Sequence, residues 1–119
     1  MRITAFDPKR PDHRTAFRDL NLVWIEEHFF VEDGDRYELD DPEAQIIEPG
    51  GQILFAENDE GGSVEVLGTC ALMAQPDRVY YLAKMAVATK ARGRGIGRAL
   101  AEAAIARARA MGGVRLELT

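Results

Sequence analysis

The sequence has little cysteine and no long apolar run. Cys70 is its only cysteine, so no internal disulfide can form, and no histidine or cysteine stands at the spacing of a metal site. No apolar segment approaches the roughly 20 residues that cross a bilayer, and the N-terminus has no signal-peptide pattern. These absences predict a cytoplasmic protein with no metal and no membrane partner.

The few potentially reactive side chains stand in unremarkable surroundings. Cys70 lies in the strand-like run Gly68–Met73, which favours a small buried hydrophobe over a nucleophile. His13 and His28 have no cysteine or carboxylate arrangement that singles them out.

Net positive charge is also lacking. The formal net charge is −5, so nucleic acid is not expected as a partner. The charge is uneven, because residues 26–48 hold ten acidic residues and one arginine, whereas residues 90–98 hold four basic residues and no acidic one. The sequence therefore predicts two surfaces with different ligands, and the acidic one is either a solvated face or an attraction for a cationic acceptor.

The 119 residues suffice for one domain of mixed α/β class. Apolar spacing and turn residues predict strands and helices in the order β-α-α-β-β-β-α-β. Asp33-Gly34-Asp35 is expected to break the first helical pattern, and Asp41-Pro42 to open the second helix. The expected elements are Arg2–Phe6, Asp12–His28, Asp40–Glu48, Gln52–Glu57, Val64–Ala74, Val79–Ala88, Gly95–Met111 and Val114–Thr119.

The most informative stretch is 86–100, where an apolar run gives way to a glycine and arginine loop and then to an alanine-rich segment. Gly93, Gly95 and Gly97 let the backbone turn tightly and come close to a ligand. The N–H groups of the following helical turn favour phosphate or carboxylate. A plain strand-to-helix turn would need only one glycine, so the loop indicates an anion site.

Two common phosphate loops do not fit this stretch. The nucleotide-hydrolysing loop needs a lysine and a hydroxyl residue after its last glycine, and neither is present. The dinucleotide fingerprint needs a third glycine at position 98, which is arginine.

The segment Arg92–Gly97 resembles the R/Q-x-x-G-x-G/A loop of the GNAT acyltransferase superfamily, and its flanks strengthen the resemblance. Leu82–Val87 looks like the superfamily's fourth strand, and Ala99–Gly112 with Val114–Leu118 looks like the helix and strand that follow. The resemblance implies a GNAT-like mixed central sheet, with residues 1–119 as a single acetyl-CoA-binding domain. The usual C-terminal helix and closing strand pair have no counterpart in this sequence.

The resemblance also implies how acetyl-CoA would bind. The backbone of the fourth strand would pair with the pantetheine arm, and the loop amides would hold the pyrophosphate. Lys84 either lies along apolar surface or marks the bulge that this strand carries in the superfamily. The implied cofactor-binding residues are Met85, Ala86, Val87, Arg92, Gly93, Arg94, Gly95, Ile96, Gly97 and Arg98.

The implied function is an acetyl-CoA-dependent N-acetyltransferase acting on a primary amine of a small molecule by direct attack. The alternative is a non-catalytic CoA-binding module, because no carboxylate accompanies Tyr81 on the fourth strand and the superfamily's tyrosine acid would lie beyond Thr119. Glu27 and Tyr81 are candidate catalytic or substrate residues whose other interpretation is a solvated or packed surface. Trp24, Phe29 and Phe30 would line an acceptor pocket or belong to the core.

The strand Val114–Thr119 is expected to lie parallel to Val79–Ala88, partly splayed from it, with an unpaired outer edge. An unpaired apolar edge is an association site. The sequence therefore predicts a homodimer that covers this edge, or a marginal domain prone to aggregation.

Overall fold

Five strands form one mixed sheet in the order β1-β2-β3-β4-β5 in the computed structural model, which describes residues 1–28, 33–59 and 63–118. The strands are β1 (Arg2–Ala5), β2 (Gln52–Asn58), β3 (Glu65–Gln75), β4 (Val79–Val87) and β5 (Arg115–Leu118). Neighbouring strands are antiparallel except β4 and β5, which are parallel. The mixed sheet and the predicted order of elements are confirmed.

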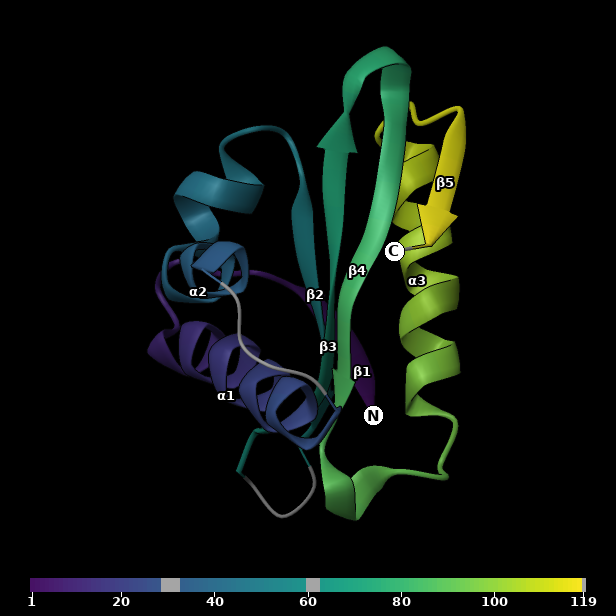
Figure 1. Cartoon of the computed structure of the whole chain (residues 1–119). Coiled ribbons are helices and arrows are strands. Elements are labelled where there is room, and N and C mark those ends of the chain that lie inside the picture. The colour runs from purple at the N-terminus through teal and green to yellow at the C-terminus, as the bar shows by residue number, and fades with distance from the viewer. Residues whose placement is uncertain (29–32, 60–62, 119) are drawn as a thin grey trace.

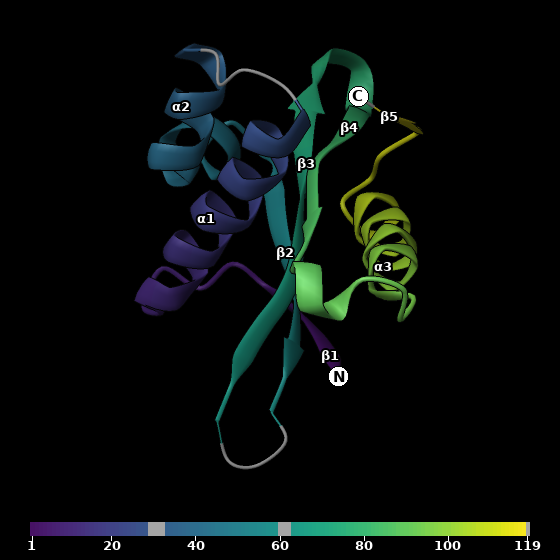
Figure 2. The same cartoon turned by 60° about the horizontal axis from the view of Figure 1, so that its bottom comes forward.

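Helices cover both faces of the sheet, as Figures 1 and 2 show. α1 (Pro11–His28) and α2 (Asp33–Asp40) lie on one face, and α3 (Ile96–Ala110) lies on the other. Each face has its own apolar core, one around Phe17, Leu39 and Phe55 and the other around Leu54, Leu72 and Leu100. Alternating side chains of β2 feed both cores, because successive residues of a strand point to opposite faces.

The second helix differs from the prediction. Asp33-Gly34-Asp35 opens α2 instead of breaking the pattern, and α2 already ends at Asp40. Acidic residues suit a first helical turn, and proline disfavours the helical conformation in the residue before it, so Asp41-Pro42 ends α2. A short π-helical turn, η1 (Glu43–Ile47), follows and buries Ile46.

β4 carries the expected bulge. Ala86 pairs with Thr69 and Ala83 with Ala71, so both Lys84 and Met85 lie opposite Cys70. Lys84 takes a φ of 55°, which L side chains rarely adopt. The bulge interpretation of Lys84 is therefore confirmed.

The parallel pairing of β5 is confirmed but short. It runs from Val79 opposite Arg115 to Leu82 opposite Leu118, and so stops before the bulge. Within the described residues, no strand pairs with the outer edge of β5 or with the β5-facing edge of residues 83–87. Thr119, the last residue of the expected strand, lies outside the described residues.

Candidate functional site

The loop between β4 and α3 turns sharply at two glycines. After a short 3-10 turn, η4 (Thr89–Ala91), Gly93 has φ 82° and Gly95 has φ 77°. A Cβ built on either glycine would meet no atom within 4 Å, so both positions need glycine for the backbone angle and not for want of space. The loop backbone is thus open to a ligand.

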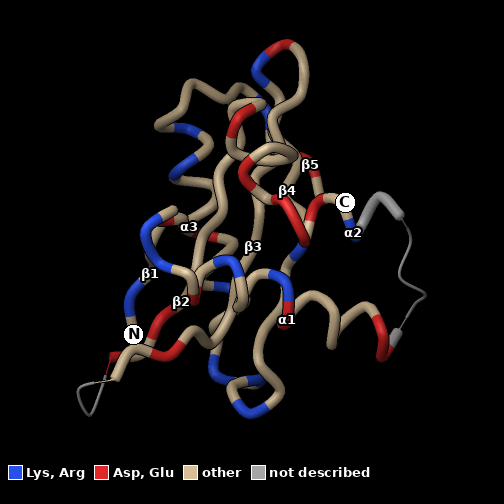
Figure 3. Tube along the Cα trace, turned by 90° about the vertical axis from the view of Figure 1, so that its left-hand side faces the viewer, with Lys and Arg blue, Asp and Glu red and all other residues tan. Residues whose placement is uncertain are grey.

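α3 starts directly after this turn, with Gly95 as its N-cap and no capping side chain. The first helical hydrogen bond runs from the Ala99 N–H to the Gly95 carbonyl at 3.0 Å, so the N–H groups of residues 96–98 lead out of the helix end. Lys and Arg residues flank this end in the sequence, and the trace in Figure 3 has blue stretches, which mark Lys and Arg, at the lower end of the molecule. Both features favour a phosphate group.

Arg92 ties the loop to β4 and to α1. Its Nε donates to the Val87 carbonyl at 3.3 Å, and its Nη2 lies 3.6 Å from Glu27 Oε2. The guanidinium carbon also lies 5.6 Å from the centre of the Trp24 ring. The structure thus brings Trp24 and Glu27, expected on the acceptor side, to the loop expected to bind the cofactor.

The other two loop arginines extend into solvent. Arg98 pairs with Glu102 one turn along α3 at 3.0 Å, and both side chains are largely exposed. Arg94 is exposed as well. Neither arginine contributes to the core, which leaves both accessible to a charged ligand.

Met85, Ala86 and Val87 join the bulge to the loop. Ala86 and Val87 pair with β3 on one side, whereas the pairing with β5 has already ended at Leu82. The Val87 carbonyl already accepts from Arg92 Nε, and the other backbone groups on the β5 side of this segment are available to an extended ligand lying along the strand.

Tyr81 lies away from the loop. It lines an open cleft of about 480 Å³ formed by the β3–β4 turn, β4 and β5. Tyr81 precedes Val87 by six residues, a distance of about 20 Å along a strand. The structure therefore does not bring Tyr81 and Glu27 together. Phe29 and Phe30 lie outside the described residues.

An ion pair at the bulge was not predicted from the sequence. Lys84 Nζ lies 3.3 Å from Glu38 Oε1 on α2, and the two side chains are only 14% and 29% exposed. The one charged residue in an otherwise apolar strand was the available signal. Its partner could not be chosen among ten acidic residues in 26–48 without knowing where α2 packs.

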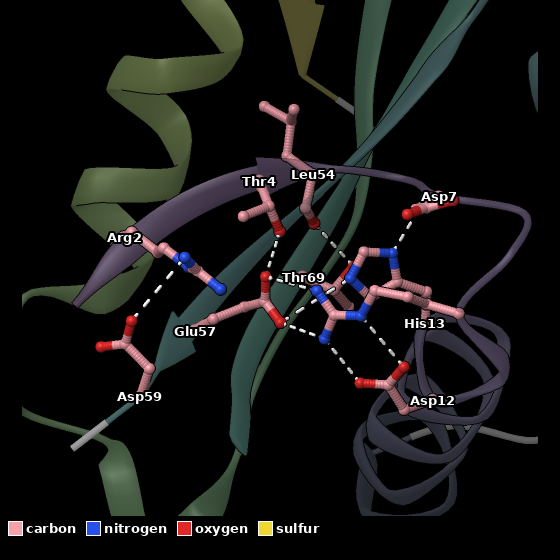
Figure 4. A network of polar contacts seen from close by, with 10 residues as sticks. Arg2, Thr4, Asp7, Asp12, His13, Leu54, Glu57, Asp59 and Thr69 are labelled. Atoms are coloured by element: carbon pink, nitrogen blue, oxygen red, sulfur yellow. Dashed lines mark hydrogen bonds and ion pairs between the residues drawn. The ribbon is translucent and has the colours of Figure 1, made fainter. Parts of the chain in front are cut away.

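A second missed feature is the buried network in Figure 4, where Glu57 is fully buried. Arg10 donates to both Glu57 oxygens, at 3.0 and 2.5 Å, and Thr4 Oγ1 donates at 2.5 Å. Burial alone would raise the pKa of Glu57, but the hydrogen bonds from Arg10 and Thr4 outweigh it and hold the pKa below its ordinary value.

His13 belongs to the same network, so the expectation that no carboxylate singles it out is wrong. Its Nε2 lies 3.7 Å from Glu57 Oε2, and its Nδ1 accepts the Asp7 N–H at 3.0 Å. Burial, followed by the nearby Arg10 charge, lowers the pKa of His13. Sequence separation hid this contact, because the start of α1 meets β2 only in the fold.

Cys70 is fully buried against α3, with Sγ 4.0 Å from the Leu100 carbonyl. Burial raises its pKa to about 12, so the thiolate is not formed at neutral pH. The interpretation of Cys70 as a small buried hydrophobe is confirmed.

None of the helices in the described part of the chain is long and apolar enough to cross a membrane.

The free edge of β4 thus leads towards the open N-terminus of α3, an arrangement that favours an anionic ligand. Comparison with known proteins agrees, because the sequence model of the Acetyltransferase (GNAT) family matches residues 18–119. The chain belongs to this family of N-acetyltransferases, which use acetyl-CoA. No relative among the curated proteins matches the chain.

Solved structures show the same fold. An acetyltransferase from Streptococcus agalactiae 2603 is 26% identical, with a TM-score of 0.76 over 98% of this chain and 71% of that one. An aminoglycoside 6'-N-acetyltransferase crystallised with coenzyme A is 22% identical, with a TM-score of 0.76 over 99% of this chain and 61% of that one. A GNAT acetyltransferase from Staphylococcus aureus Mu50 is 19% identical, with a TM-score of 0.75 over 93% and 68%. The chain thus spans between three fifths and three quarters of these relatives.

Proposed function

We propose that this chain is a single acetyl-CoA-binding domain that transfers the acetyl group to a primary amine of a small molecule. The observation that carries the proposal is the continuous path from the free β4 edge at Met85–Val87, through the loop at Gly93 and Gly95, to the open N-terminus of α3. The pantetheine arm would pair with the strand edge, and the amides of residues 93–98 would hold the pyrophosphate.

The proposed reaction is direct attack of the amine on the thioester carbonyl. A nitrogen–carbon bond forms, the carbon–sulfur bond breaks, and the CoA thiolate leaves and takes up a proton. An amine is protonated at neutral pH, so a base must first remove a proton from it. Glu27 and Tyr81 remain the proposed candidates for proton transfer, with Trp24 beside the acceptor. Glu27 lies nearer the proposed donor path, since it pairs with Arg92.

The second candidate function is a CoA-binding module without catalysis. It is favoured by the lack of a carboxylate beside Tyr81 on β4, where the strand carries Tyr80 and Leu82. In that case the loop would bind CoA, and Glu27 would serve only to hold Arg92.

Two measurements on the whole chain test these proposals. Calorimetric titration should show binding of acetyl-CoA and of free CoA, and absence of binding would contradict both functions. A thiol-release assay with a panel of small amines should show amine-dependent release of CoA. Binding without such release would support the module.

The proposed surroundings of the enzyme are a cytoplasmic location and a homodimer, with neither nucleic acid nor membrane as a partner. The net charge of −5 supports the exclusion of nucleic acid. The outer edge of β5, which pairs with no strand of the described residues, supports the dimer.

A further inference from the structure

The ion pair between Lys84 and Glu38 lies where the bulge interrupts β4. Lys84 is one of three non-glycine residues with positive φ in the described chain, and the other two, Asp77 and Arg78, lie in a turn. A glycine would satisfy this backbone angle more readily than any L side chain. Residues kept in such conformations cluster at functional sites, so the positive φ of Lys84 indicates a role for its ammonium group.

The pair is partly withdrawn from water. The Lys84 side chain is 14% exposed and the Glu38 side chain 29% exposed, with 3.3 Å between Nζ and Oε1. Exposed pairs such as Arg98–Glu102 interact weakly because water screens them, whereas a charge in this setting needs a partner of opposite sign. The two charges therefore favour a ligand that offers a group of opposite charge to each of them.

Lys84 also lies close to the proposed acetyl donor. It directly precedes Met85–Val87, and its Cα lies within about 10 Å of that of Val87 by the rise of a strand. Glu38 approaches the bulge from α2, on the face of the sheet opposite α3. An acceptor that approached the proposed thioester position from this face would come close to both charges.

We propose, resting on the acetyltransferase function above, that Lys84 and Glu38 bind the head of the acceptor, and that the acceptor carries an anionic group close to its amine. Glu38 takes the ammonium, and Lys84 takes the carboxylate or phosphate. The class is amino acids and related amines bearing an acidic group.

Charge balance supports this class over plain amines. A zwitterionic head that joins the pair gives each ion an added partner of opposite charge and leaves the local net charge unchanged. A plain ammonium must compete with Lys84 for Glu38 and adds a positive charge beside it. The pair thus acts against simple amines as well as for zwitterions.

The competing explanation is a brace that only holds α2 against β4. A brace predicts loss of stability without any change in acceptor preference. The Arg18–Asp40 pair, at 2.9 Å between Nε and Oδ1, joins α2 to α1 from a more exposed position, with side chains 47% and 57% exposed, and provides a control for a brace on α2.

The test uses three amines with the same two-carbon spacing: β-alanine, 2-aminoethylphosphonate and propylamine. At constant ionic strength, kcat/KM should be at least about ten-fold higher for one or both anionic amines than for propylamine. Comparison of the first two separates a carboxylate from a phosphonate head. Equal values for all three amines would overturn the proposal.

Three variants of Lys84 and one control variant of Arg18 locate the preference. Lys84→Met should raise KM for the anionic amines about ten-fold with little effect on propylamine, and Lys84→Arg should restore the preference in part. Lys84→Gly removes the charge and relieves the strain of the positive φ. A lost preference in this variant would therefore come from the missing charge and not from misfolding. Arg18→Met should leave the preference intact. A preference that survives Lys84→Gly would contradict the role of Lys84.

A binding measurement separates this inference from the function on which it rests. If CoA binds but no amine is acetylated, the acetyltransferase proposal fails. Ligand-observed NMR on the CoA-loaded chain then decides the site by itself. Binding of β-alanine or 2-aminoethylphosphonate that Lys84→Gly abolishes supports it, and absence of such binding refutes it.

Discussion

The guanidinium of Arg10 holds both oxygens of the Glu57 carboxylate, at 3.0 and 2.5 Å, beneath the start of α1. Glu57 is fully buried, whereas the Arg10 side chain is 27% exposed. The contact joins the segment before α1 to β2, which are 47 residues apart in sequence. A buried carboxylate that depends on one cation makes a sharp stability prediction.

Arg10→Met should destabilise the fold by about 3 kcal/mol, the low end for a broken buried pair because Arg10 retains some water contact. The reason is that Glu57 would remain buried with only Thr4 donating to it. Urea unfolding measures the change. Arg98→Met, which removes an exposed pair, should alter stability little. Comparable losses for the two variants would contradict the assigned role of Arg10.

A second prediction concerns acid stability. Burial lowers the pKa of His13 below its ordinary value of 6.5, so the folded chain favours the neutral imidazole. The unfolded chain then binds more protons below pH 6.5, and stability, complete above that pH, should fall as pH drops through the lower folded pKa. The urea midpoint should therefore decline between pH 7.5 and about pH 5.

His13→Gln is the matched variant, since its side-chain oxygen can still accept the Asp7 N–H but does not titrate. Its midpoint should be nearly flat over the same range. Glu57 titrates in a lower window, because its pKa is held below the ordinary 4.5, and its contribution is lost only as the pH falls below that value. An unchanged slope in His13→Gln would show that another group governs the decline.

The third prediction separates cofactor binding from backbone strain. Gly95 and Gly112 flank α3 with φ of 77° and 84°, and a Cβ on either meets no atom within 4 Å. Valine at either position should therefore destabilise the chain by a similar amount, about 1–3 kcal/mol. Only Gly95→Val should weaken CoA binding, by at least about ten-fold, because only that residue lies in the proposed pyrophosphate loop.

Calorimetry with CoA, at a temperature where both variants remain folded, makes the comparison. Equal losses of affinity would mean that strain and not contact with CoA explains the effect. Retention of full affinity by Gly95→Val would remove Gly95 from the proposed site.

Local patterns in the sequence predicted the order of the elements and the turn before α3, whereas the mixed sheet was expected from the family resemblance. Gly93 and Gly95 follow an apolar strand and precede an alanine-rich helical segment. Because the residues of each part favour its backbone conformation locally, strand, turn and helix could be predicted in order. The start of α2 was misplaced because Asp33-Gly34-Asp35 suits both a turn and an acidic first helical turn. Tertiary packing of Leu39, 2% exposed, decides between them.

Contacts between distant segments could not be predicted. The Glu38–Lys84 pair depends on where α2 packs, and the His13–Glu57 contact depends on which strand lies under α1. Neither contact produces a periodic pattern in the sequence. Trp24 and Glu27 were expected on the acceptor side, but their contacts with Arg92 depend on the length of α1, which carries its C-terminal end to the loop.

The last prediction concerns association through β5. Its outer edge has no partner strand among the described residues, and Leu118 and Val114 are 81% and 64% exposed. Arg115 and Glu117 alternate with the apolar residues and oppose strong association, since charged side chains protect strand edges. We therefore expect a weak homodimer that joins two β5 edges, or otherwise a marginal domain that aggregates.

Sedimentation over a concentration series should show the dimer, and Leu118→Lys should shift it to monomer without lowering the melting temperature. Leu54→Lys is no substitute for this variant, because Leu54 is buried in the core. A well-folded monomer with cooperative melting at every concentration would show that the edge is tolerated and the dimer prediction is wrong.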